Sequence, residues 1–278
     1  MNEPQSQARA IDRAASLMAP LTDLVVQAGQ AILAVNRHAM EVADKSDGSP
    51  VTEADLAADR IICDGLAQLA PDIPVLSEEC VQQSKAPYRG SFFLIDPLDG
   101  TKEFVAGRDE FTVNLALVTD GTPLLGIIGA PALRWLWRGL VGRGAERVRL
   151  TGTVVGAAEP IRTRSLPKRG APWIAAVSRS HADADTEAFI ARRTGAVREQ
   201  LGSAVKFGRL AEGAADIYPR LAPTSEWDVA AGCAVVIAAG GKVTDARGAP
   251  LRFGGQADGF LVPAFIAWGD PAAAAGPY

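Results

Sequence analysis

The sequence has few of the residues on which soft-metal sites and disulfide frameworks depend. Its 278 residues include two histidines, His38 and His181, and three widely spaced cysteines, Cys63, Cys80 and Cys233. An odd number of cysteines without a CxxC pair predicts reduced thiols, mostly in the core, in a reducing compartment. Two histidines nearly exclude a His-rich zinc site. A bound metal ion is therefore predicted to be a hard cation held by oxygen atoms.

The chain also lacks long basic and long apolar runs. Its net charge is −4 without a lysine or arginine cluster, which argues against nucleic-acid binding but permits a small phosphorylated ligand. The longest apolar run, residues 229–239, is too short to span a membrane, and the first twenty residues lack the apolar segment of a secretory signal. We therefore predict a cytoplasmic protein, and a peripheral contact with the inner membrane stays open.

What the chain does contain is the length and patterning of a globular protein. Hydrophobic residues make up 48% of it, enough for the core of one large domain or two small ones. Helical spacing of apolar residues predicts helices over 21–35 and 53–69, with a frayed lead-in over 1–19 and a turn-forming loop at 44–50. Apolar runs typical of a covered sheet predict further strands, at 75–76, 92–95, 111–118 and 124–129.

The second half of the chain alternates between predicted strands and predicted helices. The strands are 173–177, 215–218 and 242–244, and the helices are 184–193, 203–212 and 227–239. This alternation favours a layered α/β architecture. Residues 140–172 match no clear pattern, so we place a boundary near 155–165, between an N-terminal half (1–160) and a C-terminal half (161–278). The low-complexity tail, 269–278, is expected to be mobile.

Acidic residues gather where predicted strands end or predicted helices begin, namely Asp55, Glu78, Asp96, Asp99 and Asp228. Each alone is explained by a helix cap, a helix dipole or a turn. Together they carry more weight, because ligands of open α/β sheets bind at the carboxyl ends of strands. Five acids in one place repel one another unless cations neutralise them, and oxygen-only ligands favour Mg²⁺, Ca²⁺ or Mn²⁺. The spacing of "DPLDG" argues against an EF-hand calcium sensor.

A threonine and several cations accompany these acids. Thr101 follows Gly100 near the start of a predicted short helix, where free N–H groups suit an anion. Its hydroxyl could orient a water while a carboxylate accepts the proton. Cationic side chains follow later strands, at Arg179, His181, Lys206 and Arg220. A surface charge explains each alone, but their place at strand ends suits the binding of phosphate groups.

These motifs together resemble the inositol monophosphatase superfamily of Mg²⁺-dependent, lithium-sensitive phosphomonoesterases. The resemblance covers most of residues 20–250 in family order. It is carried by "KSDGSPVTEAD" (45–55), "SEE" (77–79), "DPLDGTKEF" (96–104), "SRSH" (178–181), "GSAVKFGRLAEGAADIYPR" (202–220) and "EWDVAAGCAVVIAAGG" (226–241). "DPLDGTKEF", "SRSH" and "YPR" favour the branch of 3′(2′),5′-bisphosphate nucleotidases of the CysQ type. Ala204-Val205 stands where relatives often carry Ser-Leu, which touches packing rather than catalysis.

The resemblance implies a layered αβαβα sandwich and a two- to three-metal site. One Mg²⁺ would be held by Glu78, Asp96 and the carbonyl of Leu98, a second by Asp96, Asp99 and Asp228, and a third would share Glu78. Asp55 and Thr101 would activate the attacking water, while the backbone of Gly100 and Thr101 holds the scissile phosphate. The rest of the nucleotide, in particular the uncleaved phosphate, would contact His181, Ser203, Lys206 and Arg220. The implied substrate is 3′-phosphoadenosine 5′-phosphate, a by-product of sulfate activation and sulfotransfer, hydrolysed to AMP and phosphate.

Two alternatives stay open at this point. The same metal site would serve an inositol-1-phosphate, histidinol-phosphate or fructose-1,6-bisphosphate phosphatase, and a regulator that binds metal or nucleotide without turnover is a different class. The Asp55–Thr101 pair argues against the regulator, because a binding module needs no water-activating pair. The expected partner is a small nucleotide bisphosphate, with no nucleic acid and no transmembrane segment, and the chain would be a monomer or a homodimer.

Overall fold

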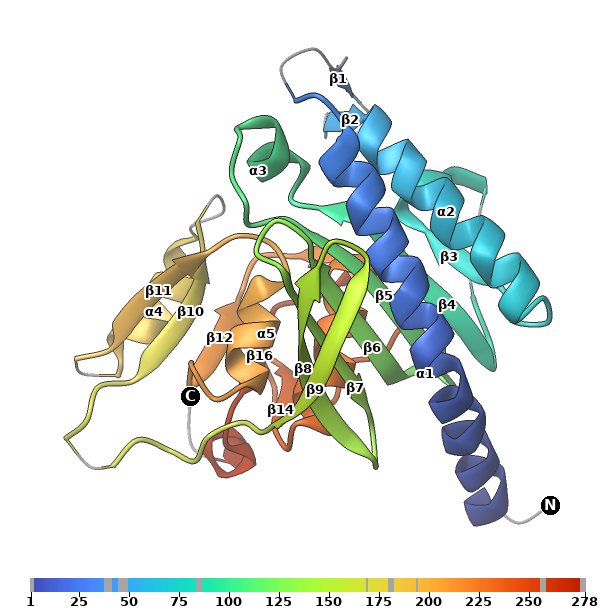
Figure 1. The fold of residues 1–278 in the computed structure, drawn as a ribbon. Coiled ribbons are helices and arrows are strands. Elements are labelled where there is room, and N and C mark those ends of the chain that lie inside the picture. Colours follow the sequence, from blue (N-terminus) through green and yellow to red (C-terminus); the bar gives the residue numbers. More distant parts are fainter. Residues whose placement is uncertain are drawn as a thin grey trace.

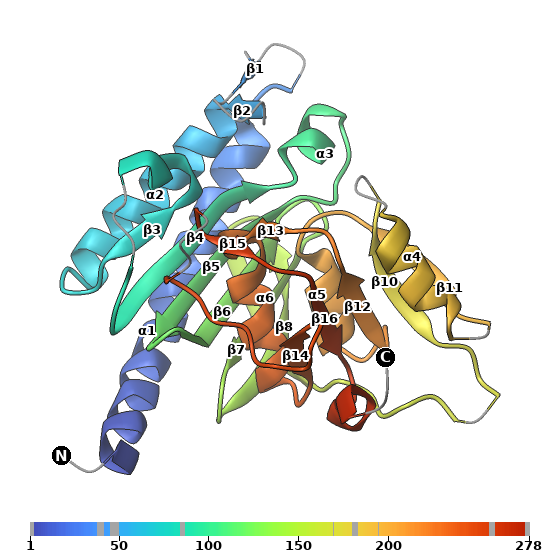
Figure 2. The same cartoon turned by 180° about the vertical axis from the view of Figure 1, so that it is seen from behind.

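Five layers of helices and sheets stack across the molecule in the computed structural model, which describes residues 3–37, 42–44, 50–83, 87–168, 170–179, 183–193, 195–255 and 259–275 (Figure 1). Helices α1 (Glu3–Ala34) and α2 (Glu53–Leu69) pack side by side on one face of a seven-stranded sheet. Helices α5 (Val205–Ala211) and α6 (Glu226–Ala238) lie between this sheet and a five-stranded sheet (Figure 2). Helix α4 (Ala184–Ala191) covers the outer face of the second sheet. The predicted αβαβα sandwich is confirmed.

The seven-stranded sheet follows the chain order from β3 to β9, with β3 parallel to β4 and every later pair antiparallel. Its strands are β3 (Val75–Ser77), β4 (Ser91–Asp99), β5 (Thr112–Thr119), β6 (Thr122–Ala130), β7 (Trp135–Leu140), β8 (Gly144–Thr151) and β9 (Val154–Ile161). Along β4, Phe93 and Ile95 pack in the cluster with α1 and α2, while Phe92 and Leu94 pack in the cluster with α6. Helices on both faces explain the long apolar runs in β4 to β6.

The five-stranded sheet brings three strand ends to one edge. Its order is β11 (Val197–Leu201), β10 (Ile174–Ser178), β12 (Ile217–Arg220), β16 (Phe265–Trp268) and β14 (Lys242–Asp245). Strand β10 is parallel to both β11 and β12, so the carboxyl ends of all three lie on the same side. The remaining short elements are β1 (Val42–Asp44), β2 (Pro50–Thr52), η1 (Glu78–Gln83), α3 (Thr101–Val105), β13 (Thr224–Ser225), β15 (Leu261–Val262) and η2 (Pro271–Ala275).

Three expectations about order and burial were wrong. The lead-in is not frayed, because α1 begins at Glu3 and continues through Pro20, with Ala14 and Leu17 of the early part buried. Part of the tail forms η2 and buries Ala274 in the outer core. Cys80 is exposed and Cys63 half-buried, so only Cys233 is a core thiol.

The unassigned stretch at 140–172 and the loop at 44–50 have different outcomes. Most of residues 140–172 forms strands β8 and β9, which complete the large sheet. Glycine and polar residues interrupt the apolar residues of β9, so this strand lacks a continuous apolar run. For the second, β1 and β2 pair as an antiparallel hairpin, and the loop residues 45–49 between them lie outside the described part of the chain.

Helix α1 is long and apolar enough over Gln7–Ala34 to cross a membrane, judged by length and composition alone. Its apolar side chains Leu21, Val25 and Ile32 are fully buried in the cluster shared with α2 and the seven-stranded sheet. Such burial is the property of a core helix, and we interpret α1 in that way.

Candidate active site

Three carboxylates meet where β4 ends and α6 begins. Asp96 and Asp99 lie on β4, Asp228 is the third residue of α6, and one carboxylate oxygen of each lies within 4.8 Å of the others. Residues three apart in a regular strand point to opposite faces. The pairing of β4 with β5 shifts register between Asp96 and Asp99, which allows both side chains to reach one place. The strand therefore continues four residues beyond its predicted end at Ile95.

This carboxylate cluster, defined as Asp96, Asp99 and Asp228, is electrostatically unbalanced. Burial raises the pKa of Asp96 well above its usual range, and the nearby Glu78, Asp99 and Asp228 raise it further. Burial and the charge of Asp99 also raise the pKa of Asp228 to about 6, although hydrogen bonds from Thr224 and Ser225 lower it. A cation would remove this conflict. The donor set is made of oxygen atoms, which fits a hard divalent ion.

Asp55 and Thr101 come together from different elements, as predicted. Asp55 is the third residue of α2 and forms a capping box with Thr52, whose N–H and hydroxyl donate to Oδ2 at 2.8 and 2.6 Å. Its other oxygen, Oδ1, lies 3.1 Å from the hydroxyl of Thr101. The cap is therefore present, and it fixes the carboxylate that faces Thr101, so capping is compatible with the catalytic role that stays a prediction.

The "DPLDGT" turn places backbone groups beside the same acids. The Leu98 N–H donates to Asp96 Oδ1 at 3.1 Å, and the Leu98 carbonyl lies 3.1 Å from the Thr101 hydroxyl. Gly100 precedes α3 with a φ of 90°, a left-handed conformation that glycine adopts without strain. This turn aligns the start of α3 with the carboxylate cluster.

Two of the predicted cationic residues, Lys206 and Arg220, line a small hollow of about 170 Å³, the cation pocket. The pocket is lined by Asp99, Ser203, Lys206, Tyr218, Arg220 and Asp228, among others. Burial lowers the pKa of Lys206 to about 8, and its Nζ donates to the carbonyls of Ser203 and Leu201 at 2.5 and 3.4 Å. Burial disfavours the charge of Arg220, but Tyr218 and the acids outweigh it and raise its pKa. Both cations thus adjoin the carboxylate cluster.

Two further predictions about cations have a different outcome. Arg179 is not free for a ligand, because its guanidinium forms an ion pair with Glu110 at 2.8 Å. His181 lies outside the described residues, so its place at the site stays a prediction.

The structure also reveals site residues that sequence reasoning missed. Asn114 and Thr112 of β5 donate to Asp99 Oδ2 at 3.2 and 3.3 Å and so hold that carboxylate in place. They are two residues apart, on the same face of a mostly apolar strand. Polar residues at alternate positions of "TVNLALV" were the available signal.

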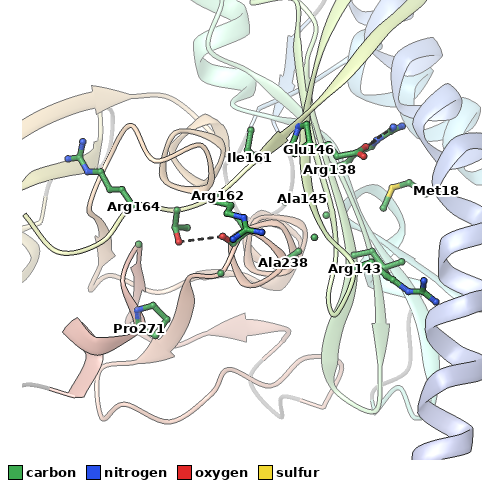
Figure 3. A pocket seen from close by; sticks show the side chains of 18 of the residues that line it. Met18, Arg138, Arg143, Ala145, Glu146, Ile161, Arg162, Arg164, Ala238 and Pro271 are labelled. Carbon is green, nitrogen blue, oxygen red and sulfur yellow. Dashed lines mark hydrogen bonds and ion pairs between the residues drawn. The ribbon is translucent and has the colours of Figure 1, made fainter.

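A larger cavity of about 900 Å³ lies away from this chemistry, between α1, β7, β8 and the end of α6 (Figure 3). Three of the arginines that line it form ion pairs: Arg138 with Glu146, Arg143 with Asp12 and Arg164 with Asp216. None of the described site residues named above lines it. Size alone therefore does not identify the active site.

Known proteins agree with the class that this fold and site define, a metal-dependent phosphatase. The model of the inositol monophosphatase family matches residues 14–275, and the chain belongs to that family. Among curated relatives, 3′(2′),5′-bisphosphate nucleotidase CysQ of Escherichia coli is 41% identical over 249 residues, covering 87% of this chain and 95% of the relative. The Salmonella typhimurium protein of the same name is 39% identical, covering 90% and 98%.

A solved structure supports the same placement. The crystal structure of CysQ from Bacteroides thetaiotaomicron, described as a bacterial member of the inositol monophosphatase family, matches with a TM-score of 0.75 and 34% identity. The match covers 91% of this chain and 97% of that one. The resemblance inferred from the sequence motifs is thereby confirmed, including its nucleotidase branch.

Proposed function

We propose that the chain is a Mg²⁺-dependent 3′(2′),5′-bisphosphate nucleotidase that hydrolyses 3′-phosphoadenosine 5′-phosphate to AMP and phosphate. The observation that carries this proposal is the carboxylate cluster adjoining both the Asp55–Thr101 pair and the cation pocket. The first two features suit hydrolysis of a phosphomonoester, and the third suits a second phosphate. The names of the curated relatives support the same activity.

The acidic cluster fits a bound divalent cation, and we propose that the site holds two to three Mg²⁺ ions. Glu78, Asp96 and the carbonyl of Leu98 would hold one, Asp96, Asp99 and Asp228 would hold a second, and Glu78 would be shared with a third. When bound, the ions supply a nucleophilic water and stabilise charge on the leaving oxygen. The support is the raised pKa of buried Asp96, caused by burial and by its acidic neighbours, which a cation would reverse.

Thr101 and Asp55 would handle the proton of the attacking water. The Thr101 hydroxyl lies within hydrogen-bond distance of Asp55 Oδ1, so it can accept from the water while donating to the carboxylate. The capping bonds from Thr52 keep Asp55 fixed during this transfer. The backbone N–H groups at the start of α3 would hold the scissile phosphate near the same hydroxyl.

Recognition of the uncleaved phosphate would fall to Ser203, Lys206 and Arg220, together with His181. A guanidinium and an ammonium lining one pocket suit a dianionic group that takes no part in the chemistry. An inositol monophosphate, the alternative substrate, carries one phosphate and would not use these cations to bind a second one.

The two halves would divide this work. We propose that residues 1–160 supply most metal ligands, and that 161–278 supply the substrate contacts and the last ligand, Asp228. The cytoplasmic location is retained as part of the proposal, whereas nothing in the described part of the chain supports attachment to a membrane surface. Whether the enzyme acts as a monomer or a homodimer is answered by its molecular mass in solution.

The test is phosphate release from 3′-phosphoadenosine 5′-phosphate and from inositol 1-phosphate, measured side by side with Mg²⁺ and with a chelator. We expect a strong preference for the nucleotide that disappears with the chelator. Preference for inositol 1-phosphate would keep the metal site but remove the roles given to Lys206 and Arg220. Release that persists in the chelator would overturn the metal site.

A further inference from the structure

The cation pocket depends on one tightly held turn, Gly202-Ser203. Ser203 has a φ of 52°, a left-handed conformation that is unfavourable for a residue other than glycine. Its carbonyl accepts the bond from Lys206 Nζ, and its hydroxyl donates to the Asp99 carbonyl at 2.9 Å. The position of this turn therefore sets where Lys206 and Ser203 lie relative to Asp99. Such a strained turn needs surrounding groups that hold it.

Glu110 is the group that reaches this turn from the other half of the molecule. It lies between α3 and β5, and its Oε2 accepts the buried N–H of Gly202 at 2.9 Å. The same carboxylate binds Arg179 with both oxygens, at 3.1 Å to Nε and 2.9 Å to Nη2. Arg179 in turn donates to the Gln200 carbonyl at 3.0 Å. One side chain thus engages the ends of both β10 and β11.

Glu110 packs so closely against Gly202 that no side chain fits at that position. A Cβ there would lie 2.5 Å from the Glu110 carbonyl oxygen and 2.9 Å from Glu110 Cβ. Two residues along, the Thr112 hydroxyl lies 2.6 Å from the Ser203 hydroxyl and 3.3 Å from Asp99 Oδ2. The stretch 110–112 therefore contacts the turn and a member of the carboxylate cluster at once.

We propose that Glu110 is a positioning residue that fixes the Gly202-Ser203 turn, and with it Lys206, at the distance from the carboxylate cluster that a bisphosphate substrate requires. This inference rests on the proposed function. Glu110 touches no reacting atom. It acts through the Gly202 N–H, while the ion pair with Arg179 keeps its carboxylate oriented toward that N–H. Its effect should therefore fall on the phosphate that is not cleaved.

The test compares Glu110→Ala with wild type on a bisphosphate, 3′-phosphoadenosine 5′-phosphate, and on a simple monoester, p-nitrophenyl phosphate, at saturating Mg²⁺. We expect Glu110→Ala to raise KM for the bisphosphate about tenfold, while kcat and the KM for the monoester change less than about threefold. Gly202→Ala should have the same selective effect, because its Cβ displaces the turn. Glu110→Gln, whose amide oxygen still accepts the Gly202 N–H, should restore most of the bisphosphate affinity.

The matched control is Glu146→Ala, which removes another glutamate held by two guanidinium bonds from an arginine, Arg138, away from the site. It should leave both KM values unchanged. An equal loss on both substrates, or no change in the bisphosphate KM, would overturn the role of Glu110. Wild-type protein that releases no phosphate from the bisphosphate would instead overturn the proposed function. In that case, Glu110→Ala would be judged by whether it weakens AMP binding in calorimetry, and unchanged binding would overturn the positioning role as well.

Discussion

The carboxylate cluster and the cation pocket both lie at strand ends, but they differ in how their charges are balanced. Asp96 and Asp99 lie at a register shift in β4 beside Asp228 of α6, and the pKa values of Asp96 and Asp228 rise because burial and like charges oppose ionisation. Of the cations, Arg220 ends strand β12 and Lys206 lies at the start of α5. Lys206 already donates to two carbonyls and lies 5.4 Å from the ring of Tyr218. Ionisation of the cluster is unfavourable without a cation, whereas Lys206 of the cation pocket already has hydrogen-bond partners within the protein.

This difference predicts that damage to the two groups will affect different steps. Loss of a carboxylate should remove the chemistry for every phosphomonoester. Loss of a pocket cation should weaken binding of one class of substrate. Each experiment below separates those outcomes.

The largest effect is expected from Asp96→Asn. Asp96 is 1% exposed at the centre of the cluster, so the change should lower kcat by about 10³-fold or more, because metal ions supply several kcal/mol of transition-state stabilisation. The measurement is kcat on both a bisphosphate and a monoester. Retention of more than about a tenth of the wild-type rate on either would show that Asp96 is not a shared ligand.

The next largest effect is expected from Thr101→Ala. Removing the hydroxyl that faces Asp55 should lower kcat by about 10²-fold, within the range of general acid–base catalysis, with little change in KM. Thr101→Ser keeps the hydroxyl and is the matched control. If alanine and serine variants were equally slow, the methyl group rather than the proton path would be responsible.

Arg220→Ala should separate the two groups most clearly. A hydrogen bond to a charged group contributes about 1.5–3 kcal/mol, so KM for the bisphosphate should rise by roughly 10- to 100-fold. The KM for a monoester should change much less, because Arg220 lines the cation pocket and not the place where Asp55 and Thr101 meet. Equal increases for both substrates would remove Arg220 from specificity.

The smallest effect concerns stability of the metal-free protein. Asp228 has a folded pKa of about 6, above the value of about 3.9 for an unfolded aspartate, so the folded state binds the proton more tightly. Its contribution to stability is therefore present below pH about 4 and is lost as the pH rises to about 6. In a chelator, thermal melting should show a lower Tm at pH 7 than at pH 5, and Mg²⁺ should reverse the order. A Tm that rises with pH in the chelator would contradict the unbalanced cluster.

The elements that the sequence predicted well share strong local patterns. Helix α2 begins and ends where its periodicity predicts, and β4 to β6 follow apolar runs. Strand β9 was missed because it lies at the sheet edge, mostly exposed, without a continuous apolar run. The first half of α1 was missed because its many alanines and exposed polar residues give little periodic signal.

The same limit explains which site residues were found. The acids of the carboxylate cluster stand within short sequence motifs, so the sequence alone was enough to predict them as site residues. Thr112 and Asn114 act on Asp99 because β5 pairs with β4, with Thr112 opposite Asp99 and Asn114 opposite Asp96. Glu110 reaches Gly202 across 92 residues of sequence. Those roles arise from strand pairing and layer packing, which no local pattern encodes.

The most direct test of the account is to locate the metal. Crystals of the wild-type protein soaked in Mn²⁺ should give anomalous density among the carboxylate oxygens of Asp96, Asp99 and Asp228, and crystals of Asp96→Asn should lose it. Density at these three residues would confirm that the cluster is a metal centre. Full Mn²⁺ occupancy elsewhere with none at the cluster would contradict it.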